Sequence, residues 1–331
     1  MSTHAATALE RLRKSLRARV GVTILGCLAL LAIFADLVAS DAPVVGRGPD
    51  GWYVLPGLVD QRAQAEQGGA AAERYAGHTA VWPLVRSGPR RSVAAPLEPA
   101  SKAHPLGTDE HGRDVLARLV HGSRTALGVS AAAIGLGILL GALLGGLAGA
   151  LRGRYNRWLE RLVDFVDTFP AIILVAILRA IEGEPTPLSL VAAVAIVRWA
   201  EVARLVRTEV LQASVEDYAL AARALGASRW RVLWRHLMPN AVGPVVVSSV
   251  FGVASVTLLE AAVSFLDMGG ETAAPSWGEL IAEAVRHPEA PWSLLLAPVV
   301  LLGSTVLGSY LLADALRDAL DPRTVRLSRE G

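Results

Sequence analysis

Several features that would indicate a soluble enzyme are scarce in this chain. Charged residues make up only 19% of its 331 residues, and aromatic residues only 5%; soluble domains average roughly 25% charged. The only cysteine, Cys27, lies in an apolar run, which excludes an intramolecular disulfide. Cysteine and histidine residues do not cluster with metal-ligand spacing. We therefore expect no metal site, no cofactor and no catalytic centre.

Two further absences concern partners. The net charge is +2, so overall charge indicates no particular partner, and we expect none among nucleic acids. The Gly-x4-Gly-Lys-Ser/Thr phosphate loop is also missing. If the protein uses ATP, another chain must bind it.

Long apolar runs are abundant. The chain is 53% hydrophobic, with a mean hydropathy of +0.42, and a spanning helix needs about 20 apolar residues. We therefore predict an all-α polytopic membrane protein with six transmembrane helices and a cytoplasmic helix–turn–helix loop. The candidate spans are Val20–Ala39, Thr125–Leu151, Val163–Ile181, Leu188–Val206, Val242–Leu266 and Leu294–Ala313. The first could instead be a secretory signal, because Val38-Ala39-Ser40 weakly resembles a cleavage site.

Basic residues predict the orientation, because cytoplasmic loops carry an excess of Lys and Arg. Basic clusters precede the first span, follow the second, separate the fourth and fifth, and follow the sixth. The turn at 182–187 has no Lys or Arg. Both termini and the loop at 214–240 are thus predicted to be cytoplasmic, in an inner membrane. The segments are a tail at 1–19, the first helix at 20–39, an extracytoplasmic insertion at 41–103, an interfacial segment at 104–124, a transmembrane core at 125–316 that includes the loop at 214–240, and a tail at 317–331.

The insertion at 41–103 is polar and rich in Pro, Gly and Ala. A short helix is expected at Gln61–Arg74, and the rest looks irregular. Two interpretations stay open: a poorly ordered insertion, or a small cap that meets a substrate-delivery protein.

The loop at 214–240 has the pattern of a soluble helix–turn–helix. Ser214 and Asp217 approximate a capping box, so a helix should start there. Gly226 can take the left-handed conformation that ends this helix. Ser228 can cap a second helix, which Pro239 should end. Such an ordered loop suggests that something docks on it.

This loop resembles the coupling loop of ABC-importer permeases, whose pattern is Glu-Ala-Ala, three residues, Gly and a later Pro. Leu220 stands where the family has its glutamate, and Asp217 one turn earlier is a candidate substitute acid. The resemblance implies that the loop couples the permease to an ATPase. The residues concerned are Asp217, Tyr218, Ala221, Ala222, Gly226 and Pro239.

The segment His104–Ser130 resembles the dipeptide/oligopeptide branch of that family, whose pattern is LGTDxxGRDVLxRLxxGxRxSL. Thr108 or Asp109 can cap, and Asp114–His121 is predicted to form an interfacial helix. Asp109, Arg113 and Asp114 either fix the entry into the second span or contact substrate, and the first interpretation is favoured.

Two spans carry further candidates. Gly137, Gly141, Gly145 and Gly149 recur every four residues in the second span, which predicts a helix-packing seam. In the third, Pro170 is predicted to kink the helix. In the fourth, Arg198 has no evident explanation.

Glu260 in the fifth span should face protein or water, because a charge there costs roughly 2–3 kcal/mol against lipid. It lines the pathway or lies in a subunit interface, and both interpretations stay open. Trp277 belongs to PSWGELIAEA, which is similar to an outer loop of the family and is a candidate for the external vestibule.

Together these motifs identify the chain as a member of the peptide-permease family, as its C-type subunit. The resemblance implies a second permease subunit, two ATP-binding subunits, an extracytoplasmic substrate-binding protein and surrounding membrane lipid. Two alternatives stay open: the same architecture importing nickel chelates or a peptide antibiotic, and a membrane-anchored sensor.

Overall fold

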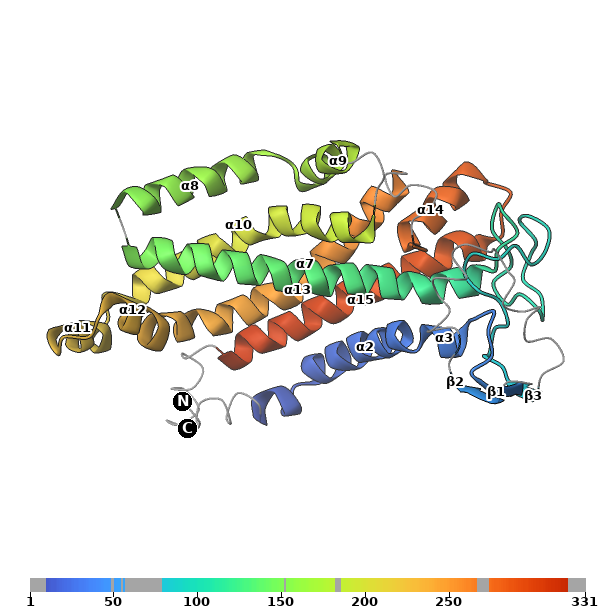
Figure 1. Ribbon diagram of the computed structural model, residues 1–331, viewed down its shortest axis with the longest axis horizontal. Coiled ribbons are helices and arrows are strands. Elements are labelled where there is room, and N and C mark those ends of the chain that lie inside the picture. Colours follow the sequence, from blue (N-terminus) through green and yellow to red (C-terminus); the bar gives the residue numbers. More distant parts are fainter. Residues whose placement is uncertain are drawn as a thin grey trace. The chain divides into compact units, whose positions relative to one another are not determined.

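The computed structural model describes residues 10–48, 51–54, 56, 79–151, 153–181, 186–266 and 274–320. Most of them are helical (Figure 1). The helices are α2 (Leu16–Ile33), α3 (Ala35–Val38), α7 (Val115–Leu151), α8 (Gly153–Thr168), α9 (Ala171–Ile181), α10 (Pro187–Ala213), α11 (Asp217–Ala224), α12 (Arg229–Val232), the π-helical turn η1 (Leu233–Leu237), α13 (Met238–Phe265), α14 (Trp277–Arg286) and α15 (Trp292–Leu320).

Four helical segments among the described residues are long and apolar enough to cross a membrane. They are α2, α7, the continuous stretch Arg229–Phe265 and α15, and they correspond to the first, second, fifth and sixth predicted spans. The third predicted span is broken at Phe169 and Pro170, which leaves α9 with 11 residues. Pro170 thus separates two helices where a kink was expected, because proline removes a backbone donor and clashes with the preceding turn.

The all-α expectation needs one correction. Part of the insertion at 41–103, expected to be irregular, forms a three-stranded antiparallel sheet of order β2-β1-β3. The strands are β1 (Val45–Gly48), β2 (Gly51–Val54) and β3 (Thr79–Val81), with Val45 opposite both Val54 and Val81. Paired β-branched residues favour strands. The helix expected at Gln61–Arg74 lies outside the described residues.

The chain divides into two compact units. Unit 1 comprises Met1–Leu25, Val129–Leu259 and Thr305–Gly331, and unit 2 comprises Gly26–Gly128 and Glu260–Ser304. In unit 1, α7 and α10 run side by side (Figure 1), with the four predicted seam glycines against α10. A Cβ at Gly141 would lie 2.6 Å from the Cβ of Val202, and one at Gly145 would lie 2.9 Å from the Cα of Ala203. Only glycine permits so close an approach.

Contacts within unit 1 explain Arg198, which had no evident explanation from the sequence. Its guanidinium pairs with Glu201 and lies beside Gly252, where a Cβ would come within 2.7 Å of Nη2. The missing side chain at Gly252 makes room for the charge. Leu159 and Val163 of α8 also pack in one cluster with Trp199 of α10.

In unit 2, the segment before α7 is anchored by buried polar groups. Asp114 caps α7, since its Oδ1 accepts from the Ala117 amide at 2.9 Å. The cap is therefore Asp114 and not Thr108 or Asp109. The helix expected at Asp114–His121 continues without a break to Leu151, because no proline or turn residue interrupts it.

Candidate functional site

The loop at 214–240 forms two helical segments joined at Gly226. The first, α11, ends just before Gly226, whose φ of +82° lies in the left-handed region. The second begins at Arg229, where the Ser228 side chain accepts from the Arg231 amide at 3.4 Å. Both features agree with the sequence analysis.

Two other expectations for the loop are wrong. The N-cap of α11 is Glu216, with no side-chain capping bond, while the hydroxyl of Ser214 donates back to the Leu211 carbonyl at 2.7 Å. Serine bonds readily to the carbonyl of the turn before it, which draws Ser214 to the end of α10. Pro239 does not end the second helix: η1 widens the helix just before it, and α13 continues. A π turn relaxes the clash that the proline ring would cause.

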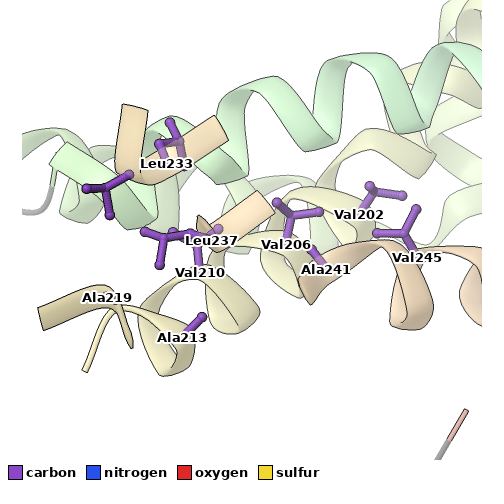
Figure 2. Close-up of a cluster of buried hydrophobic side chains, with 10 residues drawn as sticks. Val202, Val206, Val210, Ala213, Ala219, Leu233, Leu237, Ala241 and Val245 are labelled. Carbon is purple, nitrogen blue, oxygen red and sulfur yellow. The ribbon is translucent and has the colours of Figure 1, made fainter. Parts of the chain in front are cut away.

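The inner face of this loop is a hydrophobic cluster (Figure 2). Valine side chains of α10 meet Leu233 and Leu237 of η1, and Ala219 of α11 is fully buried at its edge. The buried members are Val202, Val206, Val210, Ala213, Ala219, Val232, Leu233, Leu237, Ala241 and Val245. The loop is therefore packed onto α10 and the start of α13.

The outer face of the loop exposes apolar side chains. Leu225 is 89% exposed, and Leu220, at the position of the family glutamate, is 48% exposed. Asp217 and Ala221 are also exposed, whereas Ala222 packs partly against the cluster. An exposed apolar surface on an ordered loop is typical of a protein docking site.

One polar contact joins α11 to α13 directly. Asn240 Nδ2 lies 3.2 Å from the Tyr218 hydroxyl oxygen, to which it donates. The same nitrogen donates to the carbonyls of His236, at 2.6 Å, and Leu237, at 3.2 Å. The α11 helix is thus joined to α13 by both this bond and the cluster.

Unit 1 also contains a cavity of about 1030 Å³ between α10, α13 and α15. Its polar lining comes mainly from charged residues, and its apolar lining includes Phe251 and Leu320. Ligand pockets typically measure about 300–1,000 Å³ and are lined by apolar groups with a few polar ones. This cavity has the size and lining to hold a small organic molecule.

Unit 2 contains a buried ionic cluster, made of Asp109, Arg113, Arg118, Glu279 and Glu283. Asp109 Oδ2 accepts from Arg113 Nε and from Arg118 Nη1, both at 2.6 Å. Arg118 Nη1 also lies 2.5 Å from Glu283 Oε1, and its Nη2 lies 2.7 Å from Glu279 Oε2. The guanidinium of Arg118 therefore ties the segment before α7 to α14.

Two carboxyls of this cluster have perturbed pKa values. Burial would raise the pKa of Asp109, but the Arg118 and Arg113 guanidiniums and a backbone amide outweigh it and lower that pKa. Burial raises the pKa of Glu283, against the pull of Arg118. Asp109 is therefore the more firmly ionised of the two.

A metal ion does not suit this cluster. Asp109, His111 and Glu283 place ligand atoms within 4.8 Å of one another. However, both carboxylates already bind guanidiniums, whose positive charge competes with a cation. The geometry favours an ion-pair network.

Trp277 and Glu260 are both buried in unit 2. Trp277 Nε1 donates to the Leu119 carbonyl at 2.9 Å, and its ring lies against Gly122. Glu260 Oε1 accepts from the hydroxyls of Ser276, at 2.9 Å, and Ser264, at 3.1 Å. Asp114, by contrast, binds His104 at 2.7 Å, so it does not join the cluster around Asp109.

Some residues of these sites were not singled out from the sequence. Arg118 and Glu283 lie within the quoted motifs, so the motifs could have indicated them, but pairing across more than 160 residues is not readable from spacing. Of the cavity residues, Arg317 lies in LRDALDPR (Leu316–Arg323), which is similar to a closing motif of the family, whereas Glu209 lies in no such motif.

Comparisons with known proteins agree with this architecture. A family described as "Binding-protein-dependent transport system inner membrane component" matches residues 137–326. The dipeptide transport system permease protein DppC of Escherichia coli K12 is 38% identical over 68% of this chain and 75% of its own. The corresponding protein of Alkalihalophilus pseudofirmus is 32% identical over 69% and 74%.

The oligopeptide transport system permease protein OppC of Bacillus subtilis is 33% identical over 68% of this chain and 74% of its own. Among solved structures, an inward-facing MetNI methionine ABC transporter matches with a TM-score of 0.50 and 19% identity, over 62% of this chain and 97% of that one. This likeness supports the type I importer permease fold alone. The chain is therefore a multi-pass membrane protein that belongs to the binding-protein-dependent inner membrane components, within the dipeptide/oligopeptide branch of ABC-importer permeases.

Proposed function

We propose that this chain is the C-type permease subunit of an ATP-driven importer of di- and oligopeptides. Its named relatives transport such peptides, and family membership leaves no need for the sensor alternative. A second permease subunit completes the pathway, two separate subunits hydrolyse ATP, and an extracytoplasmic protein delivers the peptide.

We further propose six spans, with α9 and α10 as the third and fourth. Two observations support this: α10 has 27 residues, about 40 Å at 1.5 Å per residue, and glycines spaced by four on α7 lie against it. The basic clusters put both termini and the loop at 214–240 in the cytoplasm.

The topology is tested by cysteine labelling. Cys27→Ala provides a cysteine-free background, and Ala221→Cys introduces one exposed thiol in the loop. A membrane-impermeant maleimide should leave Cys-substituted Ala221 unlabelled in intact cells and label it after permeabilisation. Lys102→Cys, in the outer segment, is the control and should react in intact cells. Labelling of the loop in intact cells would show that the loop lies outside the cytoplasm and that the proposed topology is wrong.

The observation that carries the coupling proposal is the packing of α11 onto α13. Tyr218 bonds to Asn240, and Ala219 is buried in the cluster of Figure 2. If a motor subunit grips the exposed face of α11, its movement reaches α13 and changes access to the pathway. Asp217, Ala221, Ala222 and Gly226 would shape the gripped surface.

Gly226 offers the sharpest test. A Cβ there would meet no other atom of this chain, so within the chain a substitution acts through the left-handed φ of +82°, at a cost of roughly 1–2 kcal/mol. In reconstituted transporter, Gly226→Val should reduce peptide-stimulated ATP hydrolysis about tenfold. Gly226→Asn should keep most of it, because asparagine tolerates this conformation.

The matched control is Gly135→Val in α7. A Cβ at Gly135 would also meet open space, but the backbone there does not have a left-handed φ. This variant should hydrolyse ATP at the normal rate. Normal stimulated hydrolysis in Gly226→Val would show that α11 is not the coupling lever.

A further inference from the structure

The cavity of unit 1 has an unusual distribution of charge. Its lining includes two carboxylates, Glu201 and Glu209, and two guanidiniums, Arg204 and Arg317. All four come from α10 or the end of α15. Whether they attract a ligand depends on which of them are already neutralised.

Two of these charges have partners. Glu201 pairs with Arg198, and its Oε1 accepts from the Ser248 hydroxyl at 2.9 Å. Arg204 pairs with Asp167 of α8. Each of these groups therefore contributes little net field to the cavity.

The other two charges have no ion-pair partner within the described part of the chain. Glu209 and Arg317 lie on different helices, line the same cavity and do not bridge each other. A carboxylate and a guanidinium held apart in one cavity complement a molecule that carries an ammonium and a carboxylate at its two ends. An anion or cation of a single sign would satisfy only one of them.

We propose that this cavity is a binding site for a small zwitterion, specifically a short peptide with free termini. The Glu209 carboxylate receives the peptide ammonium, and the Arg317 guanidinium binds the peptide carboxylate. Phe251 and Leu320 supply apolar wall for the side chains, and the volume of about 1030 Å³ is at the upper end of the range for small-molecule pockets. This inference rests on the proposed function and adds a peptide site within the permease chain itself.

The test uses the transporter purified through this chain, without the extracytoplasmic binding protein. Binding of radiolabelled Ala-Phe is compared with that of N-acetyl-Ala-Phe and of Ala-Phe amide. Each block removes one charge, and each should weaken binding about tenfold or more, because charge-assisted hydrogen bonds are lost. If the unmodified transporter does not bind Ala-Phe, or binds all three peptides equally well, the proposal is wrong.

Two variants assign the termini. Glu209→Gln should bind free and N-acetylated peptide equally while still discriminating against the amide. Arg317→Gln should show the reverse pattern. Each variant should still distinguish the free from the blocked form at the other peptide terminus, and this retained discrimination shows that the variant is folded. Glu10→Gln and Arg13→Gln, both exposed near the N-terminus, are matched controls and should behave as wild type. Wild-type discrimination at both termini in both cavity variants would also overturn the assignment.

Failure of this proposal and failure of the proposed function give different results. Uptake of Ala-Phe by the complete transporter, with no binding to the permease alone, leaves the function intact and removes the cavity site. In that case the cavity is space that a helix of the second permease subunit fills. Absence of peptide uptake by the complete transporter removes the function itself.

Discussion

The two units of this chain hold their helices together by opposite means. In unit 2, a guanidinium with almost no solvent exposure binds three carboxylates from two segments. In unit 1, α7 and α10 meet through glycines that bring backbone against backbone. The first arrangement depends on keeping every charge, and the second on keeping side chains absent. The most damaging change is therefore expected to be the loss of a charge at the Arg118 cluster and the addition of a side chain at the α7–α10 seam.

The largest effect is expected from removing the central cation of unit 2. Arg118→Met keeps the approximate volume but leaves Asp109 and Glu283 buried with less positive charge. Breaking a buried pair in this way costs roughly 3–5 kcal/mol, which should appear as a lower free energy of unfolding in SDS titration. Arg17→Met, which removes the exposed pair with Asp314, is the control and should cost at most about 1 kcal/mol. Similar losses in both variants would contradict the ionic account of unit 2.

Substitutions in α7, which carries the glycine seam of unit 1, should change the free energy of unfolding by an intermediate amount. The sign of the change depends on whether the glycine faces α10. Gly145→Ala places a Cβ against the backbone of Ala203, which cannot move aside, and overpacking of this kind costs roughly 1–3 kcal/mol. Gly135→Ala, on the same helix but facing open space, should gain up to about 1 kcal/mol from helix propensity. The same titration measures both. A gain in both variants would mean that α7 and α10 are less closely packed than described.

The smallest effect concerns pH at the surface of unit 2. His287 binds Glu289 at 3.1 Å and Glu110 at 2.8 Å, and both carboxylates raise its pKa. A histidine with a raised folded pKa stabilises the fold fully below its unfolded pKa of about 6.5, and this contribution disappears as pH rises through the folded value. The melting temperature should therefore fall slightly between about pH 6 and 8, and less so in His287→Gln. An unchanged pH profile in the variant would contradict this role.

The membrane architecture was largely predictable from the sequence. Apolar runs predicted the four long helices, and Gly226 and Ser228 marked the turn of the loop, because left-handed glycine and serine caps act over a few residues. The same local rules failed at three positions. A bond to the Leu211 carbonyl draws Ser214 to the end of α10, a π turn lets the helix continue past Pro239, and Pro170 breaks its helix instead of kinking it. Helix ends are where several local solutions have similar energies.

The sites were less predictable, because they depend on pairing between distant segments. Arg118 meets Glu283 across 165 positions, and nothing in either motif specifies that partner. The space that Gly252 leaves for Arg198 was equally unpredictable, because the two residues are far apart in the sequence. The small sheet was missed because its strands are only three or four residues long, too short for an alternating pattern to be recognised.

The side-chain amide of Asn240 has one consequence beyond holding the loop. Its nitrogen carries two hydrogens but faces three acceptors, namely Tyr218 and the carbonyls of His236 and Leu237. Because the same residue borders the cavity, a solute that claims one of those hydrogens leaves fewer for the tyrosine. If the cavity binds a solute as proposed, that solute and the bond that holds α11 would compete for a single amide.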